Sequence, residues 1–137
     1  MDEALRDAVR GWLFKAAHDL ASARKLAADP EPLLDTAIYH CQQAAEKAVK
    51  GWLTCQDAAF HRTHDVRELI AQAAGIDPRF TGWLEAGQIL TPFATAYRYP
   101  DEQLTPDRAE FDEAFLHAEK FCAFVRSILP DEVQPAP

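Results

Sequence analysis

The sequence contains few of the residues that build common catalytic and metal centres. Three of its 137 residues are cysteines, Cys41, Cys55 and Cys122, and no two of them form a Cys-x-x-Cys pair. An odd number of widely spaced cysteines predicts reduced thiols. Its two serines, Ser22 and Ser127, lie inside helical patterns, and there is no glycine-rich phosphate loop. No His/Cys spacing matches a zinc site. We therefore expect no serine or cysteine nucleophile, no metal and no cofactor.

The sequence is also poor in positive charge and in long apolar runs. Fourteen basic residues stand against 22 acidic ones, which gives a net charge of −8. Non-specific nucleic-acid binding needs a positive surface, so this balance argues against it. No run approaches the roughly 18 apolar residues that span a bilayer, and the N-terminus lacks the apolar core of a signal peptide. We expect a soluble protein of the cytoplasm without membrane contact.

What the sequence does contain is good helix formers with a 3.6-residue period. Segment 35–56 has no proline and a single glycine, Gly51. On a helical wheel its alanines, Cys, Val and Trp fill one wide apolar sector. Gln42 lies within this sector and Glu46 lies at its edge. The pattern predicts a central helix that carries polar groups where a plain core helix would not.

Helical periodicity also marks the segments 2–28, 66–75, 77–99 and 107–129. Asp65 with Glu68 three residues later predicts a capping box at the start of segment 66–75. Gly75 is predicted to end that segment as a C′ glycine. Asp77 and Pro78 are predicted to begin the next segment, and Pro92 is predicted to kink or restart it.

The predicted fold is all-α, an up-down four-helix bundle with one additional short helix. No segment shows the alternation of a strand. By length and pattern, residues 1–129 are predicted to form one domain. Residues 130–137 contain three prolines and are predicted to be a disordered tail.

Four sequence runs carry a resemblance to a known family. They are AHDLASA at 17–23, YHCQQAAEKAVKG at 39–51, THDV at 63–66 and AYRYPD at 96–101. In this order and spacing they resemble the HEPN family, over about residues 10–125. The resemblance implies a helical bundle that usually forms a homodimer. It also implies a partner, a minimal nucleotidyltransferase encoded next door, often as a toxin–antitoxin pair.

One feature of the family is missing from the chain. Many HEPN proteins are metal-independent ribonucleases that use an arginine followed roughly five to seven positions later by a histidine. Arg98 is followed at that distance by Gln103, Leu104 and Thr105, and no other arginine fits. Without this imidazole the chain lacks the general acid and base of that chemistry, so no catalytic residue is predicted.

The predicted ligand site is a cleft between the central helix and segment 97–101. A planar guanidinium at Arg98, together with Lys47, would contact phosphate, and a neighbouring tyrosine would stack on a base. The candidate nucleotide-binding residues are Arg98, Tyr97, Tyr99, Asp101, Lys47, Glu46, Gln43, Lys50 and His64. The cleft requires Arg98 to meet Glu46 across it.

These residues also have structural interpretations. Arg98 can pair with Glu46 or Asp101 while the tyrosines pack, and the lysines can be solvated. Gln42 and Glu46 can bond to Arg98, to His64 or across a dimer interface, since buried polar groups need partners.

Three functions remain open from the sequence. The first is a non-catalytic HEPN domain that binds a nucleotide, a nucleotidyltransferase partner or both. The second is a metal-independent ribonuclease toxin with a degenerate site, which uses His64 or another imidazole. The third is a structural homodimeric scaffold.

Overall fold

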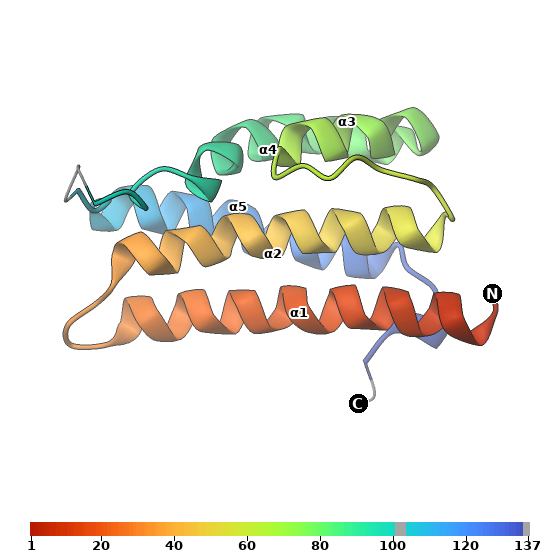
Figure 1. Cartoon of the computed structure of the whole chain (residues 1–137), viewed down its shortest axis with the longest axis horizontal. Coiled ribbons are helices and arrows are strands. Elements are labelled where there is room, and N and C mark those ends of the chain that lie inside the picture. Colours follow the sequence, from red (N-terminus) through yellow and green to blue (C-terminus); the bar gives the residue numbers. More distant parts are fainter. Residues whose placement is uncertain (101–103, 136–137) are drawn as a thin grey trace.

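The computed structural model describes residues 1–100 and 104–135, and these residues form helices and turns without a strand. The α-helices are α1 (Glu3–Ala28), α2 (Leu34–Cys55), α3 (Val66–Ile76), α4 (Leu84–Leu90) and α5 (Arg108–Ser127). Three 3₁₀ turns are η1 (Pro78–Trp83), η2 (Thr91–Ala94) and η3 (Asp131–Val133). Helix α2 lies in the middle of the molecule (Figure 1) and packs against α1, α3, α4 and α5. The predicted all-α bundle around this helix is confirmed.

Small residues on α2 explain how closely its neighbours approach. Ala44 and Ala48 are at most 1% exposed. A Cβ added at Gly51 would lie 3.0 Å from the Cβ of Trp12 on α1. The buried face of α1 is formed by Val9, Leu13, Ala16, Asp19, Leu20, Ala23 and Ala27. Helix α1 therefore lies along α2 over most of its length, and this contact places a carboxylate, Asp19, against α2.

Aspartates begin three of the helices. Asp2, Asp65 and Asp107 each accept a hydrogen bond from the backbone N–H three residues later, at 2.7 to 3.0 Å. The predicted N-cap at Asp65 is confirmed. The capping box is only half formed, because the hydroxyl of Thr63, and not Glu68, accepts the backbone N–H of Asp65.

The segment after α3 begins again at Asp77–Pro78 and at Pro92, as predicted, but it forms two 3₁₀ turns around a short α-helix instead of one longer helix. Helix α3 runs on to Ile76, and Gly75 does not have the positive φ of a C′ glycine. Asp77 then caps the 3₁₀ turn η1, and α4 has only seven residues. The reason is aromatic packing. The ring of Phe80 lies 4.6 Å from that of Trp52 and 5.2 Å from that of Phe124, and the short turn brings it there.

The C-terminal segment packs on the bundle as far as it is described. Val133 is 1% exposed, and the side-chain amide of Gln134 donates to the backbone oxygens of Arg126 and Leu129. Disorder was predicted for residues 130–137, whereas in the described part Val133 and the amide of Gln134 hold the segment to the bundle. Residues 136–137 lie outside the described part of the chain.

Candidate functional site

The polar side chains of α2 gather along one side of the helix. Tyr39, Gln43, Glu46 and Lys50 follow one another at steps of four, three and four, and Lys47 stands four positions after Gln43, which places these residues on neighbouring rows of the helix surface. Each group is held by a partner from another element or from α2 itself. Three clusters result.

The first cluster surrounds the carboxylate of Glu46, which is 4% exposed. The ring Nδ1 of His64 lies 2.9 Å from Oε1, and the Gln42 amide donates to the same oxygen at 3.0 Å. The Lys50 ammonium donates to Oε2 at 3.0 Å. The amide of Gln42 also donates to the backbone oxygen of His64 at 2.8 Å, which ties the loop before α3 to α2.

Burial and hydrogen bonding have opposite effects on the pKa of Glu46. Burial raises the pKa of the carboxyl, but the hydrogen bonds from His64, Lys50 and Gln42 together outweigh it. The pKa therefore lies below its ordinary value, and the group is a carboxylate at neutral pH. Both oxygens of Glu46 therefore have partners within the chain, while the His64 side chain remains 73% exposed.

The second cluster joins α1 to α2 through Asp19. Its Oδ1 lies 2.8 Å from Nδ1 of His40, and its Oδ2 accepts from the Lys47 ammonium at 2.5 Å. The side chain of Asp19 is 10% exposed, whereas those of His40 and Lys47 are 26% and 23% exposed. A buried carboxylate thus orients an imidazole and an ammonium that both reach solvent.

The third cluster contains Arg98. Its guanidinium carbon lies 3.6 Å from the centroid of the Tyr39 ring, a cation–π contact. Asp35, Thr36 and Tyr97 line a small hollow beside it. Arg98 itself is exposed, so one face of the guanidinium is covered by an aromatic ring while the side chain still reaches solvent.

Tyr97 fixes the backbone that presents Arg98. Its φ is +66°, a left-handed conformation that is uncommon for a residue other than glycine. Its hydroxyl donates to the carboxylate of Glu110 on α5, and its ring stacks on Phe93. The hydrogen bond to Glu110, with burial and the negative charge nearby, raises the pKa of Tyr97 to about 12. The strained conformation is held in place by contacts on both the hydroxyl and the ring.

A hollow of about 500 Å³ opens next to Arg98, at the end of the bundle where α2 begins. Leu33, Tyr99 and Leu104 line it and are 54%, 64% and 59% exposed. The other lining residues are Pro32, Leu34, Asp35, Tyr97, Arg98, Pro100 and Thr105. An exposed aromatic ring, a guanidinium and a carboxylate therefore share one concave surface.

The structure brings only some of the predicted site residues together. Arg98, Tyr97 and Tyr99 share the hollow, whereas Glu46, Lys50 and His64 form a separate cluster. Lys47 is bound to Asp19. The amide of Gln43 donates to the side-chain oxygen of its neighbour Gln42. Asp101 lies outside the described residues.

The prediction that Glu46 meets Arg98 is wrong. Both oxygens of Glu46 are bonded to Gln42, Lys50 and His64. Arg98 packs instead on Tyr39, seven positions earlier, which is about 10 Å along the helix. Of the two partners within the chain that the sequence left open for Glu46, the structure contains His64.

Three residues of these clusters were missed by sequence reasoning. Asp19 and His40 stand 21 positions apart and meet only because α1 and α2 pair. Tyr39 appeared only as the first residue of the run 39–51, although it forms the platform for Arg98. A sequence signal did exist, because AHDLASA and YHCQQ are among the runs that carry the family resemblance.

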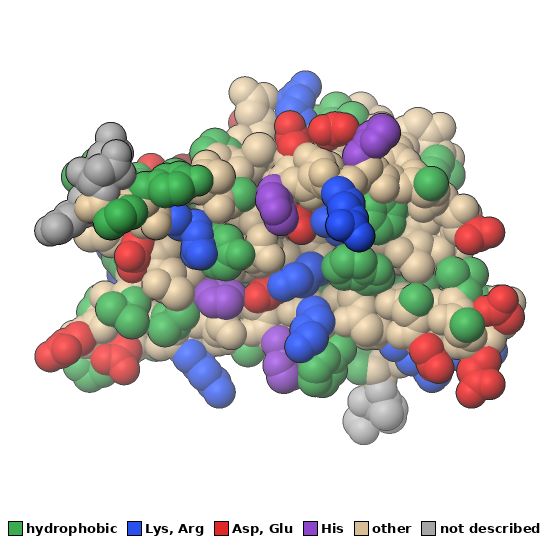
Figure 2. Space-filling view, in the orientation of Figure 1, with side chains coloured by type: hydrophobic (Ala, Val, Ile, Leu, Met, Phe, Trp, Pro, Cys, Tyr) green, Lys and Arg blue, Asp and Glu red, His purple; other side chains and the backbone are tan. Residues whose placement is uncertain are grey.

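Lys, Arg and His side chains gather mostly in the middle of the face formed by α1, α2 and the segment before α3 (Figure 2). His40, Lys47 and His64 belong to the clusters described above. The chain as a whole carries a net charge of −8. The basic side chains of these clusters are therefore paired with the carboxylates of Asp19 and Glu46.

Other kinds of site find little support in residues 1–100 and 104–135. No group of three or more His, Cys, Asp or Glu side chains there is placed to hold a metal ion. Burial raises the pKa of Cys41 and of Cys122 to about 12, so neither thiol is a ready nucleophile. Among the described helices, none has both the length and the apolar character to cross a membrane.

The fold and its polar-edged central helix define a class of small helical-bundle domains. The chain belongs to the HEPN domain family, since the family model for the HEPN domain matches residues 9–128. Among solved structures, TT1696 from Thermus thermophilus is 30% identical, with a TM-score of 0.71 over 88% of this chain and 98% of that one. ST0689, described as an archaeal HEPN homologue, is 26% identical, with a TM-score of 0.67 over 87% of this chain and 95% of that one. No curated protein matches the chain.

Proposed function

We propose that the chain is a non-catalytic HEPN domain that binds a nucleotide in the hollow at the start of α2. One observation carries this proposal: the Arg98 guanidinium lies 3.6 Å above the Tyr39 ring, at the edge of a hollow of about 500 Å³. A planar guanidinium presents a fork of N–H donors that matches phosphate oxygens. Because Tyr39 already orders the side chain, less conformational entropy is lost when phosphate binds. The hollow has the size of typical small-molecule sites.

The other lining residues suit the remaining parts of a nucleotide. Tyr99 is 64% exposed, so its ring is available to stack on a base, a contact worth about 1–3 kcal/mol. The carboxylate of Asp35 can accept hydrogen bonds from ribose hydroxyls. Tyr97 has a different role from the one first predicted. Its ring and hydroxyl are occupied by Phe93 and Glu110, so it positions Arg98.

The proposal is tested by calorimetric titration with ATP, GTP and AMP. We expect saturable binding to the wild type and a loss of at least about tenfold in affinity in Arg98→Ala, since a hydrogen bond to a charged group is removed. Arg79→Ala is the matched control, because Arg79 is bound to Asp77 outside the site. Equal and negligible heats for the wild type and Arg98→Ala would remove the nucleotide proposal.

We propose a minimal nucleotidyltransferase, in a toxin–antitoxin pair, as the protein partner. Family membership supports this proposal, and so does the exposed apolar rim of Leu33, Tyr99 and Leu104 around the hollow. Light scattering of the chain alone, and mixed with the product of a neighbouring nucleotidyltransferase gene, separates a mixed complex from a homodimeric scaffold. A mixture that stays at the masses of its separate components would contradict the partner proposal.

The His40–Asp19 pair favours a second candidate function, a ribonuclease with a rearranged site. If Nδ1–H of His40 donates to Asp19, the other ring nitrogen keeps a lone pair that can take a proton. His40 would take the proton of a ribose 2′-hydroxyl, whose oxygen then attacks the adjacent phosphorus. The ammonium of Lys47 would protonate the 5′-oxygen as it leaves.

This candidate is tested by incubating RNA with the protein in EDTA. Cleavage by the wild type that is lost in His40→Gln, but kept in His117→Gln, would support it. His117 is the control because it is partly exposed and its ring lies 3.9 Å from Glu113 on its own helix, α5. RNA that stays intact with the wild type, or cleavage that persists in His40→Gln, would exclude His40 as the base.

A further inference from the structure

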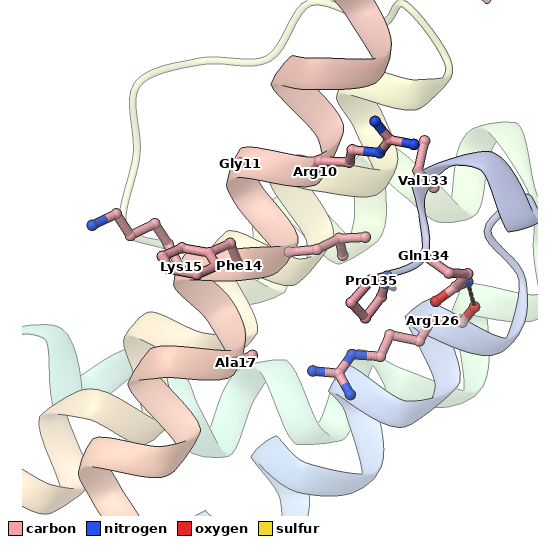
Figure 3. A pocket seen from close by; sticks show the side chains of 10 residues that line it. Arg10, Gly11, Phe14, Lys15, Ala17, Arg126, Val133, Gln134 and Pro135 are labelled. Atoms are coloured by element: carbon pink, nitrogen blue, oxygen red, sulfur yellow. Dashed lines mark hydrogen bonds between the residues drawn. The ribbon is translucent and has the colours of Figure 1, made fainter. Parts of the chain in front are cut away.

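A second hollow, of about 720 Å³, lies between α1 and the segment that follows α5 (Figure 3). It shares no lining residue with the hollow at Arg98. Its walls are mainly apolar and come from Leu13 and Ala17 on α1 and from Val133 and Pro135 on the C-terminal segment. Phe14 at its edge is 57% exposed, although large aromatic side chains are usually buried. This hollow is an apolar surface that the described part of the chain leaves open.

The charged residues around this hollow all have the same sign. Arg10, Lys15 and Arg126 line it, and no Asp or Glu is among its lining residues. In a chain with a net charge of −8, this is a local excess of positive charge. The guanidinium of Arg126 extends across the opening toward Ala17, whereas Lys15 points away from it (Figure 3). The hollow therefore combines an apolar interior with a cation directed over its mouth.

The guanidinium groups of Arg10 and Arg126 differ in their hydrogen-bond partners. Arg10 donates to the backbone oxygen of Glu132 at 2.6 Å. No carboxylate within residues 1–100 and 104–135 lies within 4.0 Å of the Arg126 guanidinium. The backbone of Arg126 is fixed, because its carbonyl accepts from the Gln134 amide at 2.6 Å. The backbone of Arg126 is thus held in place, and the N–H groups of its guanidinium can donate hydrogen bonds to an anion.

We propose that this hollow binds an apolar monocarboxylic acid. The hydrocarbon chain would lie between α1 and Pro135, and the carboxylate would bond to the fork of Arg126. The volume is in the range of typical small-molecule sites. Charge complementarity selects an anion, and the planar guanidinium matches a carboxylate in two parallel hydrogen bonds. A neutral hydrocarbon would form no ion pair with Arg126. A sugar or nucleotide would place polar groups against the apolar wall without hydrogen-bond partners.

The test uses decanoate as the probe with the full chain, followed by calorimetry and by amide NMR shifts. We expect saturable one-to-one binding, with shifts around residues 11–17 and 126–135. Arg126→Gln is expected to weaken binding by about tenfold, because a charge-assisted bidentate contact is lost. Arg79→Gln is the matched control and should bind as the wild type does. Arg126→Gln should leave nucleotide titrations unchanged, so failure here is distinguishable from failure at Arg98.

Three results would overturn the proposal. The first is the absence of saturable binding at about 1 mM decanoate. The second is equal affinity for decanoate and the uncharged decanol, or equal affinity of Arg126→Gln and wild type, which would reduce the site to a non-specific apolar patch. The third is sedimentation that shows a dimer whose interface covers Phe14 and excludes decanoate, since a second copy would then be the occupant.

Discussion

At the scale of single residues, two buried carboxylates explain the polar side of α2. Asp19 and Glu46 each receive a lysine ammonium and a histidine ring nitrogen. Such groups are tolerated inside a protein only when hydrogen bonds replace the lost water. The polar residues His40, Lys47 and Lys50 on α2 are therefore explained as partners that stabilise these buried carboxylates.

Glu46 gives the residue-scale prediction. Glu46→Ala leaves the Lys50 ammonium buried without its partner, so we expect a loss of about 3–5 kcal/mol in the free energy of unfolding. Urea unfolding at neutral pH measures this loss. Glu119→Ala is the control, because its pair with Arg24 is solvent-exposed and worth about 0–1 kcal/mol. Equal losses in the two variants would contradict the account of this cluster.

The same carboxylate predicts a pH dependence. Its pKa is lowered in the folded protein from an ordinary value of 4.5. The stability that it contributes is fully present above the unfolded-state pKa and is lost as the pH falls through the lower folded-state pKa. The free energy of unfolding of the wild type should therefore decline more steeply below pH 4.5 than that of Glu46→Gln. Parallel curves for the two proteins would show that Glu46 is not the group responsible.

The sequence predicted contacts within one helix better than contacts between different elements. The i,i+4 pair of Glu46 and Lys50 follows from helix geometry alone, and the structure contains it. The meeting of Arg98 with Tyr39 does not follow, because it depends on how the loop after η2 returns to α2. Asp19 with His40 depends on the register between α1 and α2, which local sequence patterns do not specify.

At the scale of elements, the long helices follow the sequence closely. The ends of α1, α2 and α5 lie within two residues of the predicted segments 2–28, 35–56 and 107–129, because their apolar stripes are long and regular. Segment 77–99 differs because tertiary packing overrides propensity there. Phe80 packs in the core against Trp52 and Phe124, and the backbone around it forms a 3₁₀ turn instead of an α-helix.

The contact between α3 and α4 gives the element-scale prediction. A Cβ added at Gly87 would lie 2.8 Å from the backbone Cα of Arg67, so α4 would have to move away from α3. We expect Gly87→Ala to lower the free energy of unfolding by about 1–3 kcal/mol. Gly75→Ala in α3 is the matched control, since nothing lies within 4 Å of its added Cβ. That variant should be neutral or stabilised by up to about 1 kcal/mol. Thermal unfolding of both variants checks the prediction, and equal stability would contradict the close contact.

At the scale of the whole molecule, the bundle holds three polar clusters in order along α2. The two carboxylate clusters stabilise the packing of α1 and of the loop before α3 against α2. The third cluster, at the start of α2, joins an exposed guanidinium to an open hollow. The nucleotide proposal therefore depends on this local arrangement and not on a positive overall charge, since the net charge of the chain is −8.

The central claim is that Tyr39 and Arg98 together form a nucleotide site. Its most direct measurement is calorimetric titration of ATP into Tyr39→Phe and Tyr39→Ala beside the wild type. Tyr39→Phe is expected to keep the wild-type affinity within about twofold, because the aromatic platform remains. Tyr39→Ala should lose about tenfold, because Arg98 is no longer held in place. Equal affinities for the wild type and Tyr39→Ala, or no heat from the wild type itself, would contradict it.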